Sequence, residues 1–95
     1  MDMRTSLQKD LVQVLAWAGG DPVLLGELLK DLLTPQEFEE IATRWQLVQL
    51  LDAGMPQREI SKKLGVSISK ITRGSRELLD LKGGFRQVLD RYQKS

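Results

Sequence analysis

Residues 57–71 place particular residue types at the offsets that a helix-turn-helix requires. In that motif two helices cross steeply over a tight turn, so a small residue is needed where they pack closest. Ser61 meets that need, and Gly65 supplies a turn residue that tolerates positive φ. The apolar positions of the motif are filled by Ile60, Leu64, Val66 and Ile71. An ordinary helical hairpin does not require a small residue four positions before its turn glycine, as Ser61 is here, or an apolar core residue six positions after it, as Ile71 is expected to be. The pattern therefore predicts a DNA-reading motif.

The side chains that do not serve the core of this motif carry its chemistry. On the second helix these are Ser69, Lys70, Thr72, Arg73 and Arg76. Short hydroxyl side chains near the start of a recognition helix can reach base edges or phosphates, and lysine or arginine adds reach. Gln57 and Arg58 open the first helix, where backbone N–H groups and the helix dipole favour a phosphate. Lys62 and Lys63 could flank the DNA backbone. The alternative is a solvated charged face without a ligand.

Charge is distributed unevenly along the chain. Residues 1–53 hold 4 basic and 9 acidic side chains, a net charge of −5, whereas residues 54–95 hold 10 basic and 4 acidic ones, a net charge of +6. A basic half can neutralise phosphates and release their counterions. The basic half contains the motif, which agrees with binding to nucleic acid.

Apolar residues recur at helical spacing along almost the whole chain, and no stretch of alternating apolar and polar residues is long enough to predict a strand. The expected helices are Leu7 to Ala18, one from Pro22 capped by Asp21, one from Pro35 ended by Gly54, Pro56 to Gly65, Ile68 to Leu79 capped by Ser67, and Phe85 to Tyr92. The third has the strongest start, because Thr34 and Glu37 can form a capping box around Pro35. The predicted fold class is all-α, with six helices.

Composition excludes several classes of protein. The 95 residues suffice for one domain with a modest core, which pairing with a second copy would enlarge. Cysteine and histidine are absent, so a disulfide, a Cys/His zinc site and a histidine acid–base catalyst are excluded within the chain. The apolar runs are too short to span a membrane, and no signal-peptide core follows the N-terminus. We expect a cytoplasmic protein without a membrane partner.

Four segments together resemble the Trp repressor family of bacterial DNA-binding regulators. They are LLTPQE (32–37), ATRWQLVQLL (42–51), QREISKKLGVS (57–67) and ITRGSREL (71–78). The last segment is the most specific, since ITRGS is characteristic of the end of that family's recognition helix. The N-terminal helices match only in character.

The resemblance implies an intertwined, all-helical homodimer that binds a palindromic operator in double-stranded DNA. DNA-binding homodimers with two-fold symmetry place their two recognition helices in successive major grooves, roughly 34 Å apart. We expect a single domain over 1–95, with dimerisation helices in 1–53, the helix-turn-helix in 57–80 and a C-terminal helix in 84–95. The family's DNA-contacting positions correspond to Gln57, Arg58, Ser61, Lys62, Ile68, Ser69, Lys70 and Thr72.

The resemblance also implies a site for a corepressor, L-tryptophan or a related small molecule. In the family two arginines sandwich the indole, and they correspond to Arg44 and Arg73. The leucine–threonine pair supplied by the partner subunit corresponds to Leu33 and Thr34, and the glycine beside the ligand to Gly74.

This sequence departs from the family at the ligand site in one residue. Glu77 replaces the serine near the ligand's ammonium group, four residues after Arg73, a spacing at which an ion pair could close the pocket. The carboxylate could instead bind an ammonium group directly. The stretch between Arg44 and Gln57 is also one residue shorter. Control by tryptophan, by another ligand or by none stays open.

Two other functions compete with DNA reading. A small helical enzyme of the chorismate-mutase type would use Arg44, Arg73 and Glu77 for electrostatic catalysis. Such an enzyme would not explain the helix-turn-helix pattern of residues 57–71. A protein-docking module would use Trp45, whose spacing is that of a core residue. Trp17 lies off the stripe of the first helix and could lie at a dimer interface. We predict a regulator and no enzyme.

Overall fold

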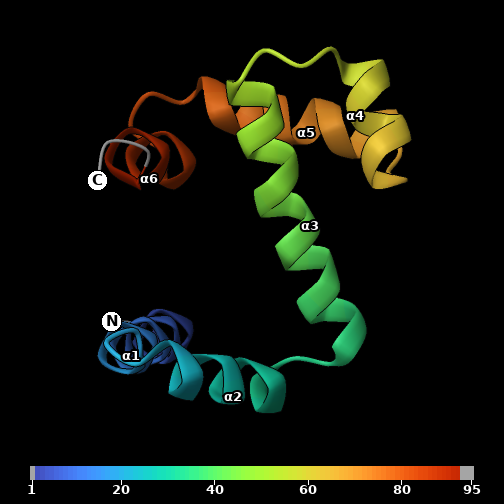
Figure 1. Cartoon of the computed structure of the whole chain (residues 1–95). Helices are drawn as coiled ribbons and strands as arrows, with labels where there is room; N and C mark the ends of the chain where they lie inside the picture. The colour runs from blue at the N-terminus through green and yellow to red at the C-terminus, as the bar shows by residue number, and fades with distance from the viewer. Residues whose placement is uncertain (1, 93–95) are drawn as a thin grey trace. The chain divides into compact units, whose positions relative to one another are not determined.

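The computed structural model of the chain describes residues 2–92, which form six helices and no strand, as predicted. The helices are α1 (Met3–Ala18), α2 (Pro22–Leu32), α3 (Pro35–Asp52), α4 (Gln57–Leu64), α5 (Ile68–Leu79) and α6 (Gly84–Tyr92) (Figure 1). The expected C-terminal segment 84–95 extends beyond the described residues at positions 93–95. None of the described helices combines the length and apolarity needed to cross a membrane. The chain divides into two compact units, one ending at Phe38 and the other beginning at Glu39.

Polar caps decide where several helices begin. The carboxylate of Asp2 accepts a hydrogen bond from the Arg4 N–H at 3.2 Å, so α1 begins at Met3. The prediction of Leu7 as its first residue was wrong, because the first turn contains only Met3 as an apolar residue and so continues no apolar stripe. Asp21 caps α2 as predicted, through the N–H groups of Val23 and Leu24 at 3.1 and 3.3 Å.

The predicted capping box at the start of α3 is confirmed. The Thr34 N–H donates to Glu37 Oε1 at 2.9 Å, and the Glu37 N–H donates to Thr34 Oγ1 at 3.1 Å. The hydrogen bond from the Thr34 backbone, followed by that with its side chain, lowers the pKa of Glu37. Two exposed residues thus define the junction between α2 and α3.

Two glycines with positive φ end helices in the second unit. Gly54, at φ 90°, follows the end of α3 at Asp52, and Gly65, at φ 66°, ends α4. Both positions strain residues with a Cβ atom, which explains the glycines. Pro56 takes the N-cap position of α4, so that helix begins one residue later than predicted.

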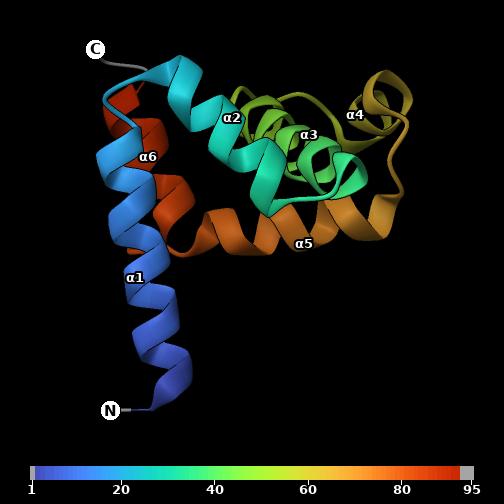
Figure 2. The same ribbon diagram turned by 90° about the horizontal axis from the view of Figure 1, so that it is seen from below.

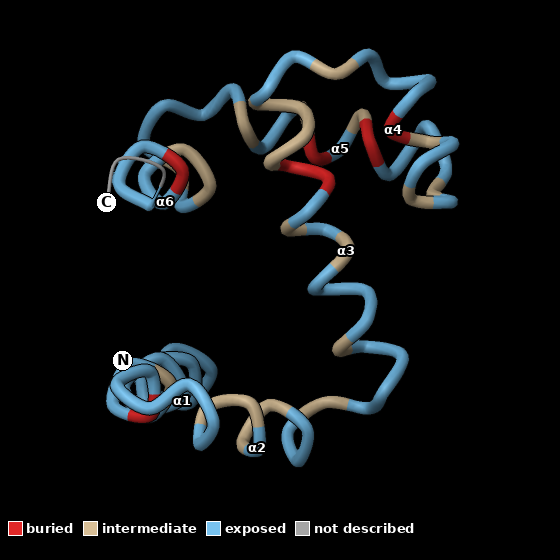
Figure 3. Tube along the Cα trace, in the orientation of Figure 1, coloured by how far each residue is buried: buried red, intermediate tan, exposed pale blue. Residues whose placement is uncertain are grey.

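The first unit, formed by α1, α2 and the start of α3, leaves much apolar surface exposed. Here α1 packs against α2, yet Ala18 is the one buried residue of α1, and Leu7 is 64% exposed. Figure 3 shows the same contrast, with buried segments in the C-terminal part of α3 and in α4, α5 and α6. The helices α1 and α2 therefore have apolar side chains that the first unit by itself leaves exposed.

The second unit has a small core in which α4, α5 and α6 meet the C-terminal part of α3. Its buried residues are Leu47, Val48, Ile60, Ile71 and Leu89. In Figures 1 and 2, α5 crosses the C-terminal part of α3, which contributes two of these five side chains. Trp45, predicted to be a core residue, is half-buried and packs against this cluster. Its ring meets that of Tyr92 edge-on at 6.2 Å.

The crossing of α3 and α5 depends on the absence of a side chain at Gly74. Gly74 is buried, and a Cβ atom placed on it would lie 2.6 Å from Leu47 Cδ2. Leu51 and Val48 lie just beyond, at 3.6 and 3.8 Å. The glycine thus allows the α5 backbone to pack directly on the side chains of α3.

We expect Gly74→Ala to destabilise the protein. Overpacking costs about 1–3 kcal/mol, because Leu47 is buried and has little room to move. Alanine gains roughly 1 kcal/mol over glycine within a helix, so the expected net loss is up to about 2 kcal/mol. Urea unfolding measures the difference.

Gly26→Ala is the matched control for this substitution. Gly26 lies inside α2 and has no atom within 4 Å of an added Cβ, so alanine should stabilise by up to about 1 kcal/mol. Equal stabilisation by both substitutions would contradict the close contact at Gly74.

Candidate nucleic-acid interface

The helices α4 and α5 and the turn between them form the predicted helix-turn-helix motif. Ile60 and Ile71 are both 0% exposed and join the two helices to the core. The Ser61 hydroxyl donates to the Val66 carbonyl at 2.7 Å, across the turn made by Gly65. Ser67 caps α5 by accepting a hydrogen bond from the Lys70 N–H at 3.3 Å. Local hydrogen bonds and the buried pair therefore determine the shape of the motif.

All eight residues predicted to contact DNA lie on these two helices. Six are exposed: Gln57, Arg58, Lys62, Ile68, Ser69 and Lys70. Ser61 and Thr72 are half-buried. Because Ser61 donates its hydroxyl hydrogen to the turn, its clearest role in this structure is to close the turn.

The hydroxyl groups of α5 also have partners inside the motif. Thr72 Oγ1 donates to the Ile68 carbonyl at 3.0 Å, and Ser69 Oγ lies 3.1 Å from Ser67 Oγ. Ser67 accepts in addition from the backbone of Lys70. Among the four α5 residues predicted to contact DNA, Lys70 has the longest side chain, and its ammonium group is a flexible donor.

The basic side chains of the motif are available to an anion. Within residues 2–92 the ion pairs involve Lys30 and Arg86, and none involves a basic side chain of α4 or α5. Arg58, Lys62, Lys63 and Lys70 are all exposed. An exposed cluster of this kind can bind phosphates through charge and long reach.

The residues that correspond to a ligand site are divided between the two units. Leu33, half-buried, and Thr34, exposed, belong to the first unit. The second unit contains Arg44, Arg73, Gly74 and Glu77, of which only the glycine is buried. Arg73 and Glu77, whose spacing would permit an ion pair, form none among the described residues.

Glu77 instead borders an open, mainly apolar pocket of the second unit. Its lining residues are Trp45, Glu77, Gly84, Phe85 and Val88, from α3, α5 and α6. Neither arginine of the expected ligand site lines it.

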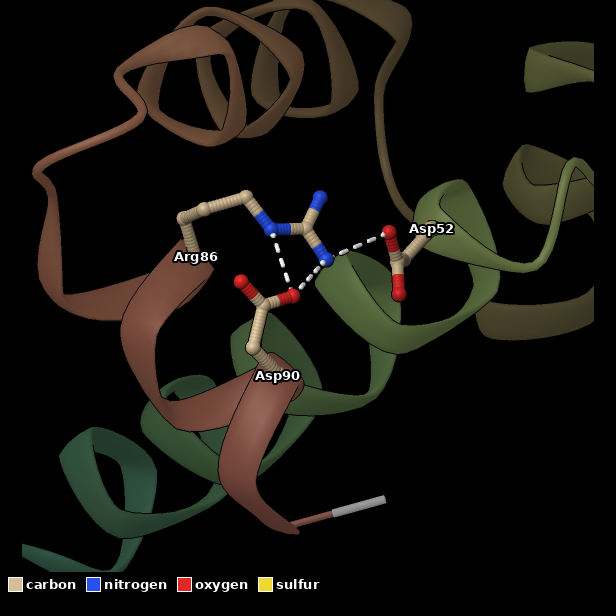
Figure 4. Close-up of polar contacts among 3 residues, drawn as sticks. All are labelled: Asp52, Arg86 and Asp90. Carbon is tan, nitrogen blue, oxygen red and sulfur yellow. Dashed lines mark hydrogen bonds and ion pairs between the residues drawn. The ribbon is translucent and has the colours of Figure 1, made fainter. Parts of the chain in front are cut away.

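An ionic cluster that the sequence analysis missed connects α6 to the end of α3. Arg86 Nη2 lies 3.0 Å from Asp52 Oδ1 and 3.0 Å from Asp90 Oδ1, and its Nε donates to Asp90 at 3.1 Å (Figure 4). The hydrogen bond with Asp52 is the main cause of a raised pKa of Arg86. The spacing of Arg86 and Asp90 on one helix could have revealed their pair. The contribution of Asp52 comes from another helix and leaves no local signal.

Comparison with known proteins gives consistent matches. A family described as Trp repressor protein matches residues 9–93. A Trp operon repressor homolog of Mannheimia succiniciproducens is 43% identical over 67 residues, which cover 70% of this chain and 66% of that protein. One from Pasteurella multocida is 52% identical over 50 residues, covering 52% and 49%. One from Chlamydia trachomatis is 38% identical over 68 residues, covering 70% and 72%. The chain thus spans less than two thirds of the first two relatives.

The role of Ser61 in the turn predicts a loss of stability on substitution. Ser61→Ala removes the donor to the half-buried region around Val66 and should cost about 0.5–1.5 kcal/mol, the net value of one hydrogen bond. Ser69→Ala is the control, because the exposed Ser69 has no hydrogen bond to the backbone through its side chain, and should change stability by less than about 0.5 kcal/mol. Chemical denaturation of both variants measures this. Equal effects would show that the hydrogen bond to Val66 contributes nothing.

Proposed function

Because the chain belongs to the Trp repressor family, we propose that it is a sequence-specific transcriptional regulator, a repressor that binds a palindromic DNA operator as a homodimer. The observation that carries this proposal is the α4–α5 motif, in which Ile60 and Ile71 are buried while the basic residues Arg58, Lys62, Lys63 and Lys70 are exposed and form no ion pair with any described residue. Membership in a family of non-enzymatic regulators excludes the enzyme alternative.

DNA reading follows from the exposed groups of the motif. Arg58 lies in the first turn of α4, where the helix N-terminus favours a phosphate. Lys62 and Lys63 lie further along α4 and can bind neighbouring phosphates. The N-terminal part of α5, with Ile68, Ser69, Lys70 and Thr72, would enter the major groove and contact base edges.

The exposed apolar side chains of α1 and α2 support the proposed pairing with a second copy. Exposed members include Leu7, Leu11, Val14, Trp17 and Val23, of which Trp17 is 75% and Val23 76% exposed. Monomeric proteins rarely expose large contiguous apolar patches. A homodimer would bury this surface and present two reading motifs to the two halves of a palindrome.

We further propose that a small molecule controls the binding of this protein to DNA. Arg44 and Arg73 would hold an indole-bearing amino acid such as L-tryptophan, with Gly74 beside it and Leu33 and Thr34 supplied by a second copy. Glu77 would face the ammonium group of the ligand. The alternative is a regulator that binds its operator without any ligand.

Selection from random DNA duplexes tests the proposed function. We expect the protein to enrich a palindrome whose half-sites are about one helical turn apart, and to bind it more weakly as salt rises. Lys70→Ala should weaken binding to that palindrome by about 1–3 kcal/mol, because the variant lacks the ammonium group that would contact a base. Fluorescence anisotropy measures the affinities.

Lys9→Ala serves as the control in this experiment. Lys9 is an exposed lysine of α1, outside the reading motif, so its loss should leave operator affinity nearly unchanged. If Lys70→Ala weakens binding to the palindrome and to random DNA equally, Lys70 contacts only phosphate and not a base. Enrichment of no sequence would refute operator recognition.

A thermal shift with tryptophan tests control by a ligand. Binding to the folded state alone raises the melting temperature as ligand concentration exceeds the dissociation constant. We expect millimolar L-tryptophan to raise the melting temperature of the wild type, and Arg44→Ala to abolish the shift without unfolding the protein. Arg4→Ala, a similar change in α1, should keep the shift. If L-tryptophan leaves the melting temperature of the wild type unchanged, the alternative of a regulator that binds its operator without a ligand is favoured.

A further inference from the structure

The hydroxyl group of Thr72 has its hydrogen engaged within α5. Thr72 Oγ1 donates to the carbonyl of Ile68, one helical turn earlier, at 3.0 Å. Threonine in a helix commonly makes this bond, which selects the rotamer of the side chain. The hydroxyl therefore has no hydrogen to donate to a base while this bond persists, and the methyl group is the remaining apolar part of the side chain.

Ile68 extends this apolar part of the reading helix. Residues four apart lie on the same face of a helix, so Ile68 and Thr72 are neighbours on α5. Ile68 is 47% exposed although it is a large apolar residue at the start of the helix. The exposed Ile68 and the methyl group of the half-buried Thr72 therefore give one face of α5, at the end that follows the turn, two apolar groups.

The major groove contains one apolar group that matches such a surface. Thymine alone among the four bases carries a C5-methyl group there, and proteins read it by apolar contact. We propose that Ile68 and Thr72 together read a thymine methyl group in each operator half-site, with Thr72 acting through its methyl group and not as a hydrogen-bond donor. This inference rests on the proposed function and specifies the base that this part of α5 recognises.

Deoxyuridine scanning of the enriched palindrome tests the inference with the wild-type protein. Deoxyuridine pairs as thymidine does and lacks only the methyl group. We expect substitution at one thymine position per half-site to weaken binding about fourfold per half-site, the effect of one methyl group removed from an apolar contact. Insensitivity at every thymine would overturn the inference.

Two substitutions at Thr72 separate the methyl group from the hydroxyl group. Thr72→Val keeps a methyl group and removes the hydroxyl, so it should retain both wild-type affinity and sensitivity to deoxyuridine. Thr72→Ser keeps the hydroxyl and removes the methyl group, so it should bind the thymine operator about fourfold more weakly per half-site and lose the sensitivity. Loss of affinity by the valine variant with retention by the serine variant would show reading through the hydroxyl and would overturn the inference.

The design also distinguishes failure of the inference from failure of the proposed function. Enrichment of no palindrome by the wild type would refute both. A palindrome bound equally with thymidine and deoxyuridine would leave operator reading intact and refute the methyl contact alone. Thermal melting of both Thr72 variants confirms that affinities are compared between folded proteins.

Discussion

The contact within the buried cluster that joins Ile60 and Ile71 to the C-terminal part of α3 is the interaction on which the second unit depends. Both isoleucines are 0% exposed, and Val48 of α3 is equally buried. Full burial of a large aliphatic side chain contributes about 1.5–3 kcal/mol, so each member is a substantial fraction of the stability of a small domain. This contact determines how α4 and α5 cross, and the crossing determines which side chains of α5 face outward.

Two small residues allow the helices around that contact to approach closely. Ser61 lets the turn pass near α4 and contributes a hydrogen bond to Val66. Gly74 lets the backbone of α5 pack on Leu47 of α3. The resemblance to the Trp repressor family gave Gly74 a place beside a ligand, but the structure supplies a role in packing that holds without one. Both residues act by keeping α5 in one orientation.

The two units of the chain differ in the surface that they leave uncovered. The first exposes apolar side chains on α1 and α2, whereas the second exposes the basic side chains of the motif. Apolar surface favours association and basic surface favours phosphates, so the proposed homodimer would use one unit for pairing and the other for DNA. The cluster of Asp52, Arg86 and Asp90 connects α6 to α3 within the second unit.

The sequence by itself determined the features that depend on neighbours within one helical turn. The capping box of Thr34 and Glu37, the left-handed Gly65 and the cap at Ser67 were all predicted, because these signals connect residues at most a few positions apart. The order of six helices followed from them. Tertiary structure alone decided that Gly74 is buried under Leu47 and that Asp52 meets Arg86. The physical reason is that such contacts join distant helices, and their partners are set by how the helices pack.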